Sequence, residues 1–146
     1  MPSITTSIQS LGPIVQLVVA VSAPRRQALQ TAGRQVPQIV LVNGLIDTGA
    51  SSTVVDLSVI QRLQIPASGM VQIMTPSTGA TPHDCNQYDV TIAIPLANNE
   101  LHLIETIPVL EASLIHHGID ALIGRDILKS AILIVNGHHD SLTLCF

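Results

Sequence analysis

The stretch LIDTGASSTVV, residues Leu45–Val55, is the most informative segment of this 146-residue chain. An apolar run that begins at Val42 leads into Asp47, and small residues with turn-forming chemistry follow it. A carboxylate at the end of a buried strand costs free energy unless it is hydrogen-bonded or paired. Because no Lys or Arg lies between Arg34 and Arg62, the sequence offers no nearby cation for that carboxylate. The segment therefore predicts either an Asp that caps a turn or a catalytic carboxylate.

Short apolar stretches recur along the whole chain, and their spacing favours a sheet structure. They are rich in β-branched residues, which suit strands, and segments rich in Gly, Pro, Ser and Thr separate them. The expected strands are Pro13–Ser22, Pro37–Ile46, Met70–Met74, Tyr88–Pro95, Leu101–Leu110, Ala121–Gly124, Ala131–Val135 and Leu142–Phe146. A helical turn is expected at Leu57–Leu63 and a short helix at Arg125–Ser130. This pattern predicts an all-β barrel or sandwich with one short helix near its C-terminal end.

Two polar segments interrupt the pattern. Residues 1–12 are rich in Ser and Thr and are expected to form a flexible N-terminal leader, so that the folded domain spans residues 13–146. The segment Ala23–Val36 is expected to be an extended hairpin loop, with room for a short helical turn. No internal repeat divides the domain, and any site sequence therefore occurs once per chain.

The composition narrows the classes of function. Hydrophobic residues make up 47% of the chain and aromatic residues 1%, so the core must consist of Val, Ile, Leu and Ala. Six basic residues against ten acidic ones give a net charge of −4, which argues against a nucleic-acid partner. The longest apolar stretch, Leu11–Val21, is shorter than the about 20 residues that span a bilayer, and no basic region precedes it as in a signal peptide. We therefore expect no membrane partner and a cytoplasmic location, which reduced Cys85 and Cys145 fit.

Four segments, taken together, resemble the retropepsins, the single-domain aspartic proteases of retroviruses and their cellular relatives. LIDTGASSTVV resembles their active-site segment, and ALIGRDIL (Ala121–Leu128) resembles their second signature, in which a hydrophobic run, a Gly and an Arg open a short helix. NQYDVTIAI (Asn86–Ile94) resembles the returning strand of their flap, and SLTLCF (Ser141–Phe146) resembles the strand with which their monomers interlock. The four segments occur in family order, and the resemblance implies a single-domain, retropepsin-like acid protease barrel closed by homodimerisation.

The number of catalytic carboxylates explains why a dimer is implied. Aspartic proteases use two carboxylates that share one proton and activate a water molecule. This chain has one Asp-Thr-Gly, and plain structural roles suffice for Asp56, Asp120 and Asp126. The second carboxylate would then be Asp47 of a second copy, placed opposite the first by a two-fold axis. The implied function is an aspartic endopeptidase that needs no cofactor and cuts an extended peptide or protein substrate next to hydrophobic residues.

The resemblance also assigns roles to individual residues. Thr48 would reach across the two-fold axis and Gly49 would offer its backbone to the substrate, so that both join Asp47 in the catalytic machinery. Substrate binding would fall to the cleft floor, the pocket walls and the tip of the flap, which are Ala50, Ser51, Val54, Leu122, Ser77, Thr78, Gly79 and Ala80. Gly79 suits the tip because glycine readily adopts positive φ.

At one position the chain departs from the commonest retroviral pattern. Ser51 stands where those proteases have an Asp that pairs with the arginine corresponding to Arg125. Arg125 is expected to have a structural role, within the chain or at the dimer, and it needs another acceptor. The candidates are Asp126, a backbone carbonyl and the partner chain, and Asp126 is itself expected to be structural.

Two interpretations compete with the enzyme. A retropepsin-like module without catalysis could serve in dimerisation or peptide binding, although its Asp-Thr-Gly is intact. An unrelated β-barrel could instead bind a small ligand. A metal site is not expected at His116–His117 or His138–His139, because adjacent residues on a strand point to opposite faces and zinc needs three or four ligands held in geometry.

Overall fold

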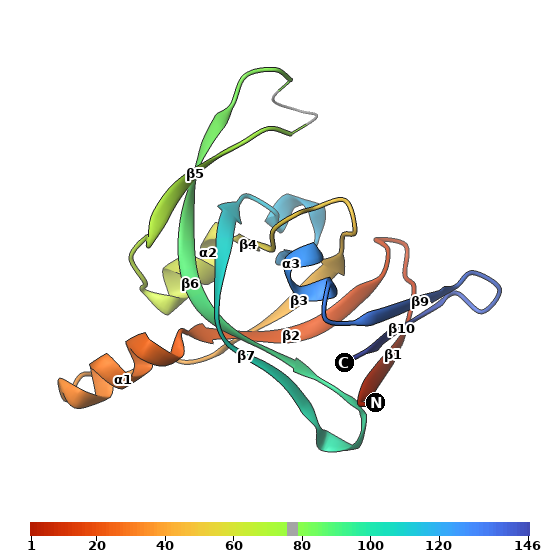
Figure 1. Cartoon of the computed structure of the whole chain (residues 1–146), viewed down its shortest axis with the longest axis horizontal. Coiled ribbons are helices and arrows are strands. Elements are labelled where there is room, and N and C mark those ends of the chain that lie inside the picture. The colour runs from red at the N-terminus through yellow and green to blue at the C-terminus, as the bar shows by residue number, and fades with distance from the viewer. Residues whose placement is uncertain (76–78) are drawn as a thin grey trace.

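Six strands form a closed barrel in the computed structural model, which describes residues 1–75 and 79–146 (Figure 1). Around the barrel, each strand is hydrogen-bonded to the next, and a pairing between β2 and β6 closes the ring. In ring order the strands are β2 (Ile14–Val21), β3 (Val40–Ile46), β8 (Ala121–Ile123), β4 (Val54–Asp56), β7 (Leu101–Ala112) and β6 (His83–Pro95). The expected all-β barrel is therefore confirmed.

The short strand β8 lies between β3 and β4, although it comes much later in the chain. It runs parallel to β3, with Leu122 opposite Leu45, and antiparallel to β4, with Leu122 opposite Val54. This insertion brings the end of β3, and with it Asp47, next to the residues that follow β8.

A hairpin projects from the barrel (Figure 1). It consists of β5 (Gly69–Ile73) and the first half of β6, with Gly69 opposite Gln87 and Ile73 opposite His83. The second half of β6 pairs instead with β2, from Val90 to Ala93. The strand β6 thus begins in the hairpin and continues into the wall of the barrel.

A separate three-stranded sheet contains both ends of the chain. Its order is β1 (Ser3–Ser7), β10 (Ser141–Cys145) and β9 (Ile132–Asn136). Here the structure differs from the flexible leader expected over residues 1–12, because five of those residues pair along their length with β10. In this single chain both edges of β10 are paired, one with β1 and the other with β9. The interlocking role expected for Ser141–Phe146 in a dimer stays a prediction.

Helices are more numerous than the sequence pattern predicts. The segment expected as an extended loop contains α1 (Ala23–Thr31), where the Ser22 side chain accepts a hydrogen bond from the N–H of Arg25 and a Pro lies in the first turn. Both are favourable helix starts, and they outweigh the polar composition that suggested a loop. The expected helices are present as α2 (Leu57–Leu63) and α3 (Arg125–Leu128). Two 3₁₀ turns, η1 (Ala97–Asn99) and η2 (Ile115–His117), flank β7.

The core consists mainly of aliphatic side chains from all barrel strands, α2 and α3, together with Leu142 and Leu144 of β10 and the ring of Tyr88. Gly44 in β3 marks how tightly it is packed, since a Cβ there would lie 2.6 Å from Cδ2 of Leu17 and 2.9 Å from Cδ1 of Ile123. Within the described residues, no helix has the length and apolar character needed to cross a membrane.

Candidate active site

The loop after β3 holds Asp47 in a turn of its own making. Its backbone N–H donates to the carbonyl of Ile123 in β8 over 3.0 Å, which fixes the start of the loop. Its Oδ1 accepts hydrogen bonds from the N–H of Gly49 at 2.9 Å and of Ala50 at 3.2 Å. Within the described part of the chain, Oδ2 has no hydrogen-bond partner, and the side chain is only half-buried. One oxygen is therefore held in place, while the other remains available for chemistry.

Arg125 supports the same loop from α3. Its Nη1 donates to the carbonyl oxygens of Thr48, at 2.8 Å, and Gly49, at 3.0 Å, and its backbone N–H donates to that of Ala50 at 2.9 Å. Of the three acceptors considered for Arg125, the structure thus shows backbone carbonyls. Because Ser51 replaces the Asp with which this arginine pairs in most retroviral proteases, Arg125 instead binds the backbone of the turn after Asp47.

A buried network lies behind the loop. Thr53, which is fully buried, donates from its N–H and Oγ1 to the two oxygens of Asp126, at 2.8 and 2.7 Å. The N–H of Gly124 in turn donates to Thr53 Oγ1 at 3.1 Å. Asp126 therefore joins the two signature segments of the chain.

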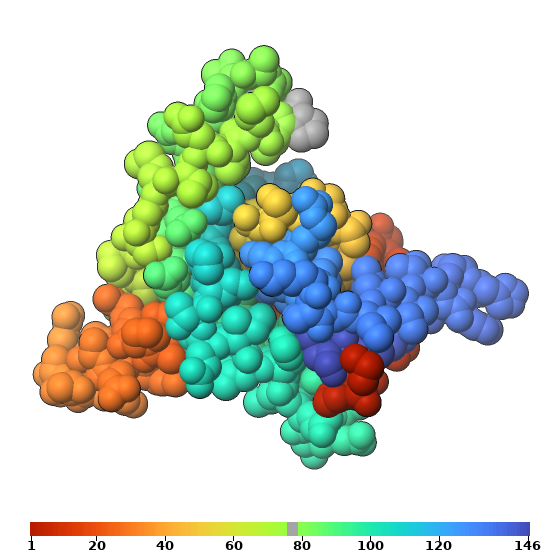
Figure 2. Space-filling model, in the orientation of Figure 1, coloured from red at the N-terminus to blue at the C-terminus, as the bar shows by residue number. Residues whose placement is uncertain are grey.

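Asp47 opens into a hollow of about 450 Å³ below the projecting hairpin. Figure 2 shows the hairpin standing clear of the loop that follows β3. The residues that line the hollow are Asp47, Gly49, Ala50, Ser51, Ser52, Val54, Ile73, Met74, Thr75, Leu110 and Leu122. The walls are mostly apolar, so the carboxylate is the only ionisable group among these lining residues.

The structure gathers most, but not all, of the residues that the sequence singles out. Asp47, Gly49, Ala50, Ser51, Val54 and Leu122 all line the hollow. Thr48 is exposed beside it, while Gly79 and Ala80 are exposed near the tip of the hairpin, with Gly79 at φ +62°. Ser77 and Thr78 lie outside the described residues. Sequence reasoning missed Ser52, Ile73, Met74, Thr75 and Leu110; the apolar ones are indistinguishable from core residues until the hairpin is placed over the barrel.

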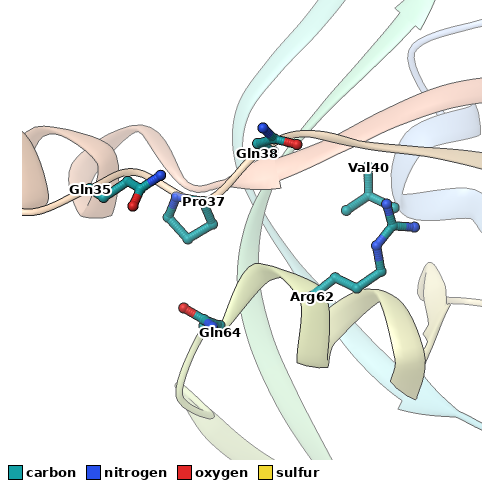
Figure 3. A pocket seen from close by; sticks show the side chains of 6 residues that line it. All are labelled: Gln35, Pro37, Gln38, Val40, Arg62 and Gln64. Atoms are coloured by element: carbon teal, nitrogen blue, oxygen red, sulfur yellow. The ribbon is translucent and has the colours of Figure 1, made fainter.

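A second hollow, of about 370 Å³, lies between α2 and the segment that leads into β3 (Figure 3). Its lining residues are Gln35, Pro37, Gln38, Val40, Arg62 and Gln64. None of these lining residues carries a carboxylate, an imidazole or a thiol, so this hollow offers no such group for acid–base or nucleophilic catalysis. The Asp47 hollow is therefore the candidate active site.

Among the described residues, no group of three or more His, Cys, Asp or Glu side chains is arranged to hold a metal ion. Cys85 and Cys145 are both free thiols. The ring of His138 packs edge-on against that of His139, at a centroid distance of 4.8 Å, in the turn after β9.

The sequence and the fold match a known class of protein. The chain belongs to the retroviral aspartyl protease family, whose sequence profile matches residues 10–135. A retropepsin-like aspartic protease from Rickettsia conorii is similar in structure, with a TM-score of 0.62 and 14% identity over 99% of this chain and 90% of that one. These two findings confirm the retropepsin-like barrel.

Other solved structures align with lower TM-scores. The retroviral protease-like domain of Ddi1 from Leishmania major has a TM-score of 0.45 and 14% identity over 89% of this chain and 86% of that one. EIAV protease in complex with the inhibitor HBY-793 has a TM-score of 0.40 and 22% identity over 62% of this chain and 76% of that one. No curated protein sequence gives a significant match.

Proposed function

We propose that this chain is an aspartic endopeptidase whose catalytic dyad forms when two copies place their Asp47 side chains face to face. The observation that carries the proposal is the difference between the two carboxylate oxygens of Asp47. Its Oδ1 is fixed by two backbone N–H groups, and its Oδ2, which accepts no hydrogen bond from the described residues, lies at the edge of an apolar hollow. An Asp whose only task was to cap the turn would not need such a hollow in front of it.

Two such carboxylates can hydrolyse a peptide bond without a cofactor. When they lie about 3 Å apart they cannot both be ionised, so they share one proton. The ionised one removes a proton from a water molecule as the water oxygen attacks the peptide carbonyl carbon, and the protonated one donates to the carbonyl oxygen. The newly protonated carboxyl then donates its proton to the nitrogen as the C–N bond of the tetrahedral diol breaks. The other carboxylate removes a proton from a diol hydroxyl as the carbonyl re-forms, so the pair again holds one proton. Each chain supplies one carboxylate, and Thr48 and Gly49 would complete the site.

The free edge of β9 is the surface on which a second copy would pair. The strand has β10 on one side only, carries no charge, and exposes Ile132, Ile134 and Val135 by 51, 53 and 60%. An unprotected apolar edge strand readily pairs with another strand. Because β9 carries no charge, the β9 strands of two chains can pair about a two-fold axis without like-charge repulsion. Antiparallel β9–β9 pairing would join the two small sheets into one.

The substrate that fits this hollow is an extended peptide with hydrophobic side chains at the cut. Val54, Leu110 and Leu122 form apolar walls, and Ile73 and Met74 descend from the hairpin. The hairpin would cover the peptide and supply backbone hydrogen bonds, as in strand addition.

Digestion of a peptide library by wild type and Asp47→Asn tests the catalytic role. Asn keeps an oxygen that can accept from Gly49 and Ala50, so the turn should persist while the base is lost. Asp89→Asn, on barrel strand β6, serves as the matched control and should cut like wild type. Cleavage by Asp47→Asn at the wild-type rate would disprove the assignment, and a folded dimer that cuts nothing would favour the non-catalytic module.

The dimer surface is tested separately by Ile134→Lys. A charge on this edge should oppose strand pairing, so sedimentation should show monomers and cleavage should be lost together. Leu101→Lys places the same charge on another exposed apolar residue, 61% exposed at the start of β7, and should leave the dimer intact. A dimeric, active Ile134→Lys protein would rule out pairing through β9.

A further inference from the structure

A second carboxylate is held where the hairpin joins the barrel. Glu111 lies near the end of β7, and both oxygens of its side chain accept hydrogen bonds from β6. Oε1 accepts from Nδ2 of Asn86 and Oε2 accepts from the hydroxyl of Tyr88, each at 2.7 Å. The backbone carbonyl of Glu111 also accepts from Sγ of Cys85, at 3.1 Å. Three nearby residues of β6 are thus tied to one residue of β7.

These bonds lie at the point where β6 leaves the barrel wall. The β6–β7 ladder ends with Gln87 opposite Leu110, and the residues of β6 before that pair with β5 alone. Glu111 is the next residue of β7 beyond this last pair. Its side chain therefore continues the connection between the barrel and the hairpin after the backbone ladder has stopped.

The same two strands carry walls of the Asp47 hollow. Leu110 lines the hollow, and Glu111, its neighbour on the strand, points to the opposite face. Ile73 and Met74 reach the hollow from the β5 side of the hairpin. The Glu111 bonds therefore act on the hairpin from outside the hollow.

We propose that Glu111 is a positioning residue, whose carboxylate, by binding Asn86 and Tyr88, holds the β5–β6 hairpin at its working distance above Asp47. The proposal deepens the protease function proposed above and rests on it for its effect on substrate. Glu111 itself touches neither Asp47 nor the hollow. Loss of its charge would leave the barrel closed but let the hairpin swing at its base.

The chain contains a built-in probe of this contact. Tyr88 is its single Tyr and there is no Trp, so the phenolate absorbance band in the near ultraviolet reports this residue alone. The hydrogen bond to Glu111, followed by burial, raises the pKa of Tyr88 above its ordinary value of about 10. Glu111→Gln should lower the midpoint of the absorbance titration, because the negative acceptor that disfavours phenolate is gone.

The matched control is Glu105→Gln. Glu105 lies on the same strand and is exposed, and its backbone carbonyl accepts a hydrogen bond from Oγ1 of Thr91. Among the described residues, its side chain has no hydrogen-bond partner. The absorbance titration of Tyr88 in Glu105→Gln should follow that of wild type. Far-ultraviolet circular dichroism across the titration restricts the comparison to folded protein. An unchanged Tyr88 midpoint in folded Glu111→Gln would show that the contact does not exist in solution, and would overturn the proposal.

Hydrogen exchange then tests the positioning itself. In Glu111→Gln, peptides covering Gly69–Ile73 should exchange about tenfold faster, the scale expected when a hydrogen bond to a charged group is lost. Peptides covering Ile132–Asn136 should exchange as in wild type. Tyr88→Phe removes one of the two bonds while keeping the buried ring, and should give a smaller change in the same direction.

Kinetics connects the hairpin to the substrate. We expect KM for a peptide substrate to rise about three- to tenfold in Glu111→Gln with a smaller change in kcat, since binding and not the dyad is disturbed. Wild-type exchange and wild-type KM in this variant would overturn the proposal. The titration and the exchange need no cleavage, so they remain decisive even if the protease function were refuted.

Discussion

Thr53 and Asp126, separated by 73 positions in the sequence, form a two-point contact in which Thr53 donates both hydrogen bonds. The N–H of Thr53 binds one carboxylate oxygen and its Oγ1 binds the other, at 2.8 and 2.7 Å. Thr53 ends the loop that carries Asp47, whereas Asp126 lies in the first turn of α3. This contact is therefore how the two signature segments of the chain become one rigid support for the Asp47 carboxylate.

A double-mutant cycle over this contact should show strong coupling. Thr53→Val and Asp126→Asn each remove hydrogen bonds to a charged group in a buried setting, and each should lower the free energy of unfolding by about 1–3 kcal/mol. The double variant should lose less than the sum, because the second change removes a contact already broken. Urea unfolding gives all three values, and strict additivity would contradict the direct contact.

Gly124→Ala should destabilise the protein because the backbone of the Asp47 loop passes too close. A Cβ at Gly124 would lie 2.6 Å from the carbonyl carbon and 2.7 Å from the carbonyl oxygen of Ser52. Backbone atoms cannot move aside as a flexible side chain can, so we expect a loss of about 1–3 kcal/mol or more. Gly137→Ala, with no atom within 4 Å of the added Cβ, is the control and should leave the urea midpoint nearly unchanged.

Asp56 should make stability fall in acid. The side chain is only 3% exposed and accepts from the N–H groups of Ser58, Leu114 and Ile115 at 2.9, 2.7 and 3.0 Å. Burial raises the pKa of Asp56, but the hydrogen bonds from Ser58, Leu114 and Ile115 outweigh it, and the net pKa is lowered. A lowered pKa contributes stability above the unfolded value of about 4, which is lost as the pH falls through the folded value.

The measurement for Asp56 is urea unfolding at pH 7 and pH 3. At pH 7, Asp56→Asn should cost about 2–4 kcal/mol, since one amide oxygen cannot replace both carboxylate oxygens. At pH 3 the difference in unfolding free energy between wild type and Asp56→Asn should narrow. Protonation of the Asp56 carboxylate then removes part of the stability that its ionised form contributes at pH 7. An equal gap at both pH values would contradict this account.

His102 should make protein stability depend on pH as well, though less strongly than Asp56 does. Its ring stacks on that of Phe146, with centroids 3.8 Å apart and planes at 11°. Burial lowers the pKa of His102, so the neutral form contributes stability above the unfolded pKa of about 6.5. That contribution is lost as the pH falls through the lower folded value.

Thermal melts of His102→Phe test this dependence. Phe keeps an aromatic ring against Phe146 but cannot be protonated, so its Tm should fall less than that of wild type between pH 7.5 and pH 5. His138→Gln, at an exposed turn residue, is the control and should follow wild type. Parallel melting curves for wild type and His102→Phe would show that His102 does not contribute.

Local chemistry alone was enough for a large part of the fold and for the centre of the site. Apolar runs bounded by turn residues predicted the barrel strands, because a strand that must bury aliphatic side chains carries that requirement in its own sequence. The turn at Asp47 was likewise predictable, since the acceptor Oδ1 and the donors of Gly49 and Ala50 are neighbours in the chain. Two elements were not predicted. One is α1, because the polar composition of its segment indicated a loop although Ser22 offered a cap, and the other is β1, because its residue Thr5 pairs with Thr143, 138 positions away.

The sequence by itself determined that this chain folds as a β-barrel and carries one Asp-Thr-Gly at the end of a buried strand. The tertiary structure decided what surrounds that carboxylate: which carbonyls receive Arg125, that Met74 and Leu110 reach the same hollow, and that Glu111 grips the hairpin at its base. The physical reason is the sequence separation of the interacting residues. Turns and strands depend on neighbours along the chain, whereas a hollow and a hydrogen-bond network depend on where distant strands meet in space.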